Sequence, residues 1–357
     1  MVQHDKWVAK VSVSVPAGRL ACWLVLLVLG CSAGEEAKPV KSAAQLREEL
    51  QSLEKGHKEE IRNNPQDALP YIELGDVLLQ QSRFDDAMKA YDAALNVDSL
   101  QARAFAGFGK VLFRRGNTDQ AVAAYQRALA LDGDNVETYR QLGDVHLRAR
   151  RYVKAQQAYQ AALAIEPEHA RTHYNIGVAY SGWRSYKSSV ASLKKATNLD
   201  DGYALAFYTL GDVQCLKLGE CEESVAAMQK AISLQPQKER FYSGLGRIYL
   251  RLNRYEEAVD AFRQAVERDS SVAPAHNGLG QALGGWRRLA KAEGHLRRAL
   301  GLNPAYPEAH YNLSAVYLKQ GKVEEGQRQK QIFDRVNAYF DSIRKSRMLL
   351  AANPNDP

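Results

Sequence analysis

A glycine that returns every 34 residues constrains this chain of 357 residues more than any other feature. Inside a helix, glycine costs about 1 kcal/mol relative to alanine, so its repetition needs a structural reason. The successive spacings are 34, 34, 34, 34, 35 and 34 residues, and an eighth copy, again 34 residues on, has serine instead. These positions are Gly75, Gly109, Gly143, Gly177, Gly211, Gly246, Gly280 and Ser314. Such a period is typical of an array of one supersecondary unit, because each unit buries its apolar face only against its neighbours.

Other residues keep a fixed distance from the repeated glycine, as the third copy shows. Leu142 directly precedes Gly143, and Tyr139 lies four residues before it. Ala155 and Ala162 lie twelve and nineteen residues after it. Small residues at helical spacing allow two helices to approach closely, and large residues fill the space that remains. Each copy is therefore predicted to be a pair of helices.

Prolines end several of these predicted pairs, because proline cannot continue a helix. Pro167 and Pro304 each lie 24 residues after the repeated glycine. The whole pattern resembles the tetratricopeptide repeat family, whose unit is a 34-residue helix–turn–helix. The resemblance covers about residues 68–340 and implies an all-α fold, a right-handed α-solenoid of about eight helix-turn-helix units with a capping helix at each end. The expected units are 68–101, 102–135, 136–169, 170–203, 204–238, 239–272, 273–306 and 307–340.

The two ends of the predicted array differ from its middle. Residues 42–64 are predicted to form an N-terminal capping helix with a narrow apolar stripe. The eighth unit departs from the pattern, as expected of a terminal repeat, because Gly326 replaces the first alanine, Lys330 the aromatic residue and Phe333 the second alanine. Its last helix is expected to run on to about Leu350, so that residues 341–357 hold the end of this helix and a tail. The apolar residues that this helix is expected to bury are Ile332, Phe333, Val336, Tyr339, Phe340 and Ile343.

Residues 1–30 have the features of a signal peptide, because three basic and one acidic side chain precede ten apolar residues at 20–29. Ten helical residues span roughly 15 Å, about half of the bilayer core, which is too short to cross it. The sequence Val28-Leu29-Gly30-Cys31 resembles a bacterial lipobox, which implies cleavage before Cys31 and attachment of lipid to it. Residues 31–41 are then a lipidated tether, and the serine after the cysteine favours the outer membrane, facing the periplasm. An ordinary signal peptide with an incidental cysteine is the alternative.

Two further cysteines lie in the 35-residue unit. Cys215 lies four residues after Gly211, and Cys221 takes the position of Phe84 and Tyr152 in other units. Because that aromatic position packs back on the first helix, the two sulfurs are candidates for a disulfide in an exported protein. Two buried thiols are the alternative.

Charge and residue types argue against several functions. The 48 basic and 41 acidic residues are interspersed, whereas nucleic-acid binding requires a concentrated basic stripe. No set of side chains resembles a nucleophile with its base, so we predict no enzymatic activity and no cofactor. No metal site is predicted either, because His173, His276 and His310 occupy the aromatic position of separate units and are expected to be packed there.

The resemblance places the binding site on the concave face, which the first helices line in this family. Ligand contacts in the family come mainly from the positions six, three and two before the glycine and one after it. In this chain, the groove residues predicted in this way are Arg103, Lys110, Arg140, Arg171, Tyr174, Asn175, Tyr208, Asn277, Tyr311 and Asn312. Arginine offers a planar fork for carboxylates, and tyrosine suits interfaces. The expected ligand is therefore an extended, acidic or aromatic-bearing segment of a protein partner.

These observations together predict an envelope-anchored scaffold that recruits proteins for the assembly of a pilus, a secretion system or a similar machine. An accessory regulator of a peptidoglycan- or glycan-synthesis enzyme is the alternative. Contact with the membrane is expected through the lipid anchor only.

Overall fold

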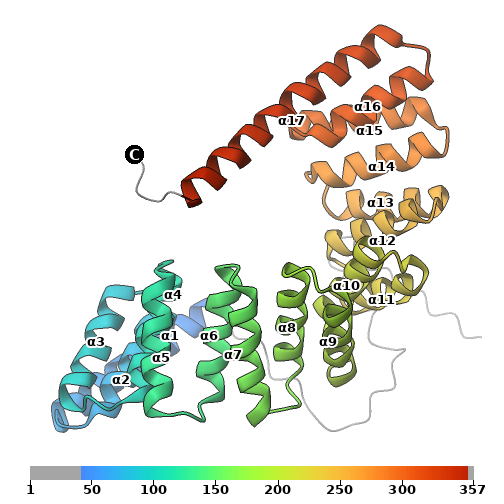
Figure 1. Cartoon of the computed structure of the whole chain (residues 1–357). Helices are drawn as coiled ribbons and strands as arrows, with labels where there is room; N and C mark the ends of the chain where they lie inside the picture. The colour runs from blue at the N-terminus through green and yellow to red at the C-terminus, as the bar shows by residue number, and fades with distance from the viewer. Residues whose placement is uncertain (1–41, 353–357) are drawn as a thin grey trace, which may run out of the picture. The chain divides into compact units, whose positions relative to one another are not determined.

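The computed structural model describes residues 42–352, without the side chains of 347–352 (Figure 1). The predictions for the signal peptide, Cys31 and the tether therefore lie outside the described residues. The chain divides into two units, residues 1–49 and residues 50–357.

The described part of the first unit begins the helix α1 (Ala43–Asn63). Ser42 and Gln45 form a reciprocal cap at its start. The Ser42 N–H donates to Gln45 Oε1 at 2.8 Å, and the Gln45 N–H donates to Ser42 Oγ at 3.2 Å. Two backbone donors that the helix leaves free are satisfied in this way.

The second unit contains eight consecutive helix pairs, as the glycine period predicts, so the all-α repeat array is confirmed. The first helices of the pairs are α2 (Ala68–Gln80), α4 (Ala102–Arg114), α6 (Val136–Arg148), α8 (Ala170–Gly182), α10 (Ala204–Val213), α12 (Glu239–Arg251), α14 (Ala273–Gly285) and α16 (Pro307–Lys319). The second helices are α3 (Phe84–Val97), α5 (Thr118–Leu131), α7 (Tyr152–Ile165), α9 (Tyr186–Leu199), α11 (Cys221–Leu234), α13 (Tyr255–Arg268), α15 (Leu289–Leu302) and α17 (Val323–Ala352). In the 35-residue unit, a short π-helix, η1 (Gln214–Leu218), follows α10 and accommodates the extra residue.

In four units the repeated glycine leaves room for an aromatic ring of its own second helix, and in units four and seven for a leucine. A Cβ atom on Gly143 would lie 2.4 Å from the ring of Tyr159, which is fully buried. The same ring position also meets the next unit, since a Cβ on Gly107 would lie 2.4 Å from the Tyr91 ring. The glycine is therefore kept by side-chain packing, which outweighs its low helix propensity.

The aromatic or histidine position four before the glycine has a polar role as well. In five units its side chain donates a hydrogen bond to the carbonyl six residues earlier, in the preceding loop. The pairs are Tyr71 with Pro65 (3.5 Å), His173 with Pro167 (2.9 Å), Tyr242 with Pro236 (3.1 Å), His276 with Ser270 (3.2 Å) and His310 with Pro304 (2.9 Å). Either tyrosine or histidine can occupy this position, because each combines a ring that packs well with a hydrogen-bond donor.

The last helix differs from its prediction. Helix α17 reaches Ala352, but Tyr339 and Phe340 are exposed, so the prediction that the helix buries them is wrong. They lie beyond the stretch of α17 that corresponds to the 14 residues of α15, and none of the described elements covers them.

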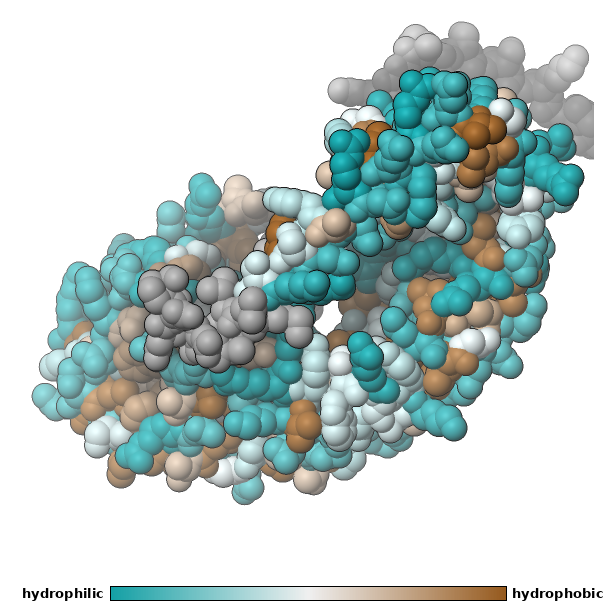
Figure 2. All heavy atoms as spheres, turned by 45° about the horizontal axis from the view of Figure 1, so that its top comes forward, coloured by the Kyte–Doolittle hydropathy of each residue, from teal (hydrophilic) through white to brown (hydrophobic). Residues whose placement is uncertain are grey.

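None of the helices in residues 42–352 combines the length and the apolar character that a membrane span requires. Figure 2 shows that hydrophilic residues cover most of the face drawn there and that hydrophobic residues appear in small, separate groups.

Candidate functional site

The first helices form one continuous face in the second unit. Each first helix contacts the first helix of the next pair, from α2 with α4 through to α14 with α16. Side chains at the predicted binding positions lie along this face, which we call the first-helix face.

Ion pairs within the protein divide the predicted cationic residues into two groups. Arg103 donates to Asp76 at 2.9 Å, and Arg140 donates to Glu166 at 2.7 Å. Arg171 forms no ion pair with a described residue, and the same is true of Lys110 on α4. Arg171 and Lys110 are therefore better placed than Arg103 and Arg140 to bind a carboxylate of a partner.

Three predicted residues meet in one hollow between α8 and α10. Arg171, Tyr174 and Asn175 line a cavity of about 490 Å³ together with Tyr203, whose ring centre lies 5.1 Å from that of Tyr174. Burial raises the pKa of Tyr203 to about 12, so its hydroxyl remains a donor at neutral pH. Asn175 donates to Asp144 at 3.0 Å, and this bond fixes the orientation of its amide.

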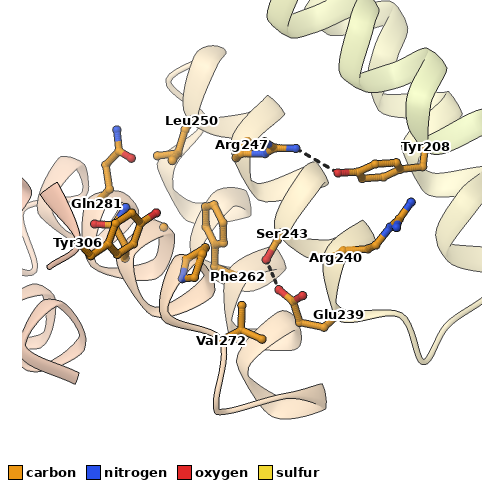
Figure 3. Close-up of a pocket in the computed structure, with 13 residues that line it drawn as sticks. Tyr208, Glu239, Arg240, Ser243, Arg247, Leu250, Phe262, Val272, Gln281 and Tyr306 are labelled. Carbon is orange, nitrogen blue, oxygen red and sulfur yellow. Dashed lines mark hydrogen bonds between the residues drawn. The ribbon is translucent and has the colours of Figure 1, made fainter. Parts of the chain in front are cut away.

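A second hollow, of about 380 Å³, lies between α10, α12, α14 and the loop before α16 (Figure 3). A neighbouring hollow of about 270 Å³ between α12, α14 and α16 shares Leu250 and Gln281 with it. We call the two together the C-terminal groove. Of the predicted residues, Tyr208 and Asn277 line the first part and Asn312 lines the second.

Two arginines on α12 give the C-terminal groove its chemistry. Arg247 donates to Asp212 at 2.6 Å and to the Tyr208 hydroxyl at 3.3 Å, so its guanidinium is held in place. Arg240 lies 4.7 Å from the centre of the Tyr208 ring and forms no ion pair with a described residue. Burial raises the pKa of Tyr208. Beside these groups, Phe262 contributes an apolar wall, as Figure 3 shows.

An amide pair crosses the C-terminal groove. Asn312 donates to Asn277 Oδ1 at 2.9 Å, and Tyr306 lies against Asn277 in the first hollow. Amide groups offer both donors and acceptors, which suits the backbone of an extended peptide.

Among the lining residues that sequence reasoning missed, four with polar side chains lie at the family's ligand-contact positions. Arg240, Ser243 and Arg247 lie six before, three before and one after Gly246, and Gln281 lies one after Gly280. These are the same positions that predicted the other groove residues. Applying the position rule to every unit, the sixth included, would have found them.

The remaining predicted groove residues lie outside these hollows. Arg103, Lys110 and Arg140 line none of them, and Tyr311 is 52% exposed at the last unit. The structure thus brings together Arg171 with Tyr174 and Asn175, and Tyr208 with Asn277 and Asn312. A ligand contact by any of these residues stays a prediction.

The two cysteines of the 35-residue unit are joined. The sulfurs of Cys215 and Cys221 lie 2.08 Å apart, and both residues are buried. The bond links η1 to the start of α11, where other units have an aromatic ring.

One further cluster was not apparent from the sequence. His57 Nδ1 lies 2.9 Å from Glu60 and 3.5 Å from Glu73, and Arg103 lies 3.8 Å from Glu73. Histidine and glutamate can both bind metal ions, and the ligand atoms of these three side chains lie within 4.8 Å of one another. Among the described residues, no other three histidine, cysteine, aspartate or glutamate side chains lie together in this way. Because Arg103 already balances Glu73, an ion-pair network accounts for the arrangement.

Models of the tetratricopeptide repeat match most of the array. They cover residues 69–99, 109–149, 136–169, 170–203, 216–273 and 277–326, and their descriptions are "TPR repeat" and "Tetratricopeptide repeat". None of the curated proteins matches the sequence.

Solved structures of similar fold are distant in sequence. The crystal structure of MamA is 28% identical over 45% of this chain and 94% of its own, with a TM-score of 0.44. The structure from the functional characterization of Pseudomonas aeruginosa pilF is 19% identical over 58% of this chain and 95% of its own, with a TM-score of 0.50. A tetratricopeptide repeat protein from Parabacteroides merdae ATCC 43184 is 17% identical over 70% of this chain and 98% of its own, with a TM-score of 0.52. The latter two similarities concern the fold alone.

Proposed function

This chain belongs to the tetratricopeptide repeat family, and we propose that it is a lipid-anchored scaffold that binds a protein partner in its C-terminal groove, in the assembly of an envelope machine such as a pilus or secretion system. The observation that carries the proposal is Arg240, a guanidinium on the groove wall that no carboxylate of the described chain neutralises. A repeat array of this kind serves binding, because its extended face offers many side chains to one ligand.

The partner segment is expected to be extended and to carry a carboxylate beside an aromatic side chain. Arg240 offers the planar fork that pairs with a carboxylate, and Tyr208 holds it at the groove wall. Leu250 offers apolar contact to a ring, and Gln281 offers hydrogen bonds to a peptide backbone. Arg171 provides a second cationic anchor in the hollow between α8 and α10.

Location in the envelope is supported by two independent features. Cys31 follows an apolar stretch in the manner of a lipobox. The bond between Cys215 and Cys221 is a structural disulfide, and such bonds persist in oxidising compartments such as the periplasm. Substituting Cys31→Ser should release the protein from the membrane fraction and abolish its labelling by radioactive palmitate. Unchanged labelling would contradict the anchor.

The groove is tested by affinity capture from detergent-solubilised envelope, followed by mass spectrometry. We expect Arg240→Glu to reduce recovery of the partner by about tenfold or more, because it removes an ion pair and introduces repulsion. Arg263→Glu is the matched control, since Arg263 is exposed on the second helix α13. Equal recovery by both variants would contradict the groove assignment, and recovery of a glycan-synthesis enzyme would favour the regulator.

A further inference from the structure

Within residues 42–352, no element covers an apolar face of the last unit. In units one to seven, the first helix of the next pair packs against the preceding second helix and first helix. Among the described elements, α17 packs only against α16. A terminal repeat normally presents a polar outer face, because an exposed apolar face makes an array insoluble. The eighth unit does not follow this rule.

Equivalent positions in the first and last units show the difference. Ile72 and Leu79 lie three before and four after Gly75, and they are 1% and 8% exposed. Tyr311 and Leu318 occupy the same positions in unit eight, and they are 52% and 50% exposed. The last unit therefore exposes large apolar side chains at positions where the first unit buries them.

Helix α17 extends this face beyond the array. It has 30 residues, whereas α15 has 14, and Figure 1 shows it running back along α16 and well past the start of that helix. Ile332, Val336, Tyr339 and Ile343 follow one another at steps of four, three and four residues, the spacing of a helix–helix seam. Tyr339 is 63% exposed. We call the following residues the end face: Tyr311, Leu318, Ile332, Phe333, Val336, Tyr339, Phe340 and Ile343.

We propose that the end face binds the end face of a second copy of this chain. The face continues the helix-on-helix interface that already joins each unit to the next, so its natural occupant is another helix. The first helix pair of a second copy is not available as this partner, because α1 already packs against it. Gln81 donates to the Leu50 carbonyl, and Arg83 pairs with Glu54 of α1. Two copies therefore meet tail to tail about a two-fold axis, the commonest symmetry of protein dimers.

The charges on α17 fit an antiparallel pair. Glu324 and Glu325 lie in its first turn, and Arg344 and Lys345 lie near the end of its described side chains. Antiparallel pairing brings the acidic start of each helix next to the basic end of the other, whereas parallel pairing would align like charges. Residues 323–346 carry five basic and four acidic side chains, a balance that does not suit an anionic membrane surface.

The first experiment measures self-association of the full chain by analytical ultracentrifugation, in mild detergent so that the apolar stretch at 20–29 does not join chains. We expect a reversible dimer that the combined substitution Tyr339→Glu and Phe340→Glu weakens by about 100-fold or more, because the apolar seam is lost. Trp183→Glu is the matched control, since Trp183 is a 54% exposed apolar residue in the turn after α8. A monomer at every concentration, or a dimer that Tyr339→Glu and Phe340→Glu leave intact, would overturn the proposal.

A charge exchange tests the orientation, independently of the apolar seam. Glu324→Lys with Glu325→Lys should weaken the dimer about tenfold, and so should Arg344→Glu with Lys345→Glu. All four substitutions in one chain should restore the dimer, because opposite charges meet again. If the fourfold variant dimerises as weakly as either double variant, the antiparallel arrangement is wrong.

Discussion

The third and fifth units of the array share a short sequence in their first helices, but different side chains pack against it. Both have glycine followed by aspartate, Gly143-Asp144 and Gly211-Asp212. In unit three, the Tyr159 ring fills the space beside the glycine and its hydroxyl donates to Asp144. In unit five, the position of the ring belongs to Met228, which has no donor.

The aspartate also has different partners in the two units. Asp144 is held from within its own unit by Tyr159 and from the next unit by Asn175. Asp212 instead accepts from Arg247 of the next unit. Asp212 thus holds an arginine on the wall of the C-terminal groove.

The two units also differ at the turn between their helices. Unit three places Tyr152 at the start of its second helix, and this ring fills the space that Gly182 of the next unit leaves. Unit five has Cys221 there, an additional residue in η1, and the bond to Cys215. A covalent link therefore takes the place of ring packing where the helix spacing is irregular.

The largest expected effect is on stability, and it differs between the glycines of the two units. Gly143→Ala should destabilise the protein by about 2 kcal/mol, because its Cβ would overlap a ring that is buried and tied to Asp144. Gly211→Ala should be nearly neutral, because its nearest contact, the Ser224 carbonyl, is 3.1 Å away and the gain of about 1 kcal/mol in helix propensity offsets the crowding. Urea unfolding followed by circular dichroism measures both, and equal costs would contradict the role of the ring.

The disulfide is expected to matter almost as much, and only in unit five. Replacing Cys215 and Cys221 together with alanine should lower the free energy of unfolding by about 2 kcal/mol, because the closed loop is short. Reductant should lower the Tm of the native protein and leave that of the alanine variant unchanged. If reductant lowers the Tm of both proteins equally, the disulfide is not the cause of the shift.

The tyrosine hydroxyl of unit three is expected to contribute less. Tyr159→Phe should cost about 1 kcal/mol, because Asp144 loses one of its two donors. Tyr125→Phe is the matched control, since Tyr125 occupies the same buried position in unit two and its hydroxyl bonds to no described residue. Thermal unfolding should give Tyr159→Phe a lower Tm than Tyr125→Phe. Identical Tm values would show that the Tyr159 hydroxyl does not stabilise the protein.

The smallest effect concerns pH. Burial raises the pKa of the Asp144 carboxyl above its ordinary value of 3.8. The folded state therefore binds this proton more tightly than the unfolded state, so the contribution of Asp144 to stability falls as the pH rises from about 4 through the folded pKa. Relative to the native protein, Asp144→Asn should gain stability between pH 4 and pH 7, by less than about 1 kcal/mol. A constant difference between the two proteins across this range would show that the carboxyl is not perturbed.

Much of the fold could be predicted because the signal is repeated. Any one glycine in a helix is ambiguous, but eight copies in phase with alanine and tyrosine positions specify the number of helix pairs and their order. The exposure of Tyr339 and Phe340 could not be predicted in this way, because an apolar stripe shows that a helix has a buried face without showing whether a partner is present.

The candidate site could be predicted only in part. Position within the unit pointed to Arg103, Arg140 and Arg171 alike, yet only Arg171 lacks a carboxylate partner among the described residues. Helix spacing accounts for the ion pair of Arg140 with Glu137, three residues before it. It does not give the pairs with Asp76 and Glu166, which lie 27 and 26 positions from their arginines in the chain.

The sequence by itself determined that this chain is a linear array of eight helix pairs, because each pair contacts only its neighbours and local periodicity then suffices. Only the tertiary structure decided which groove arginines are neutralised, that the C-terminal groove gathers its residues from four consecutive units, and that the end face is uncovered. Each of these depends on side chains that meet across units, and their contact is set by three-dimensional packing rather than by spacing along one helix.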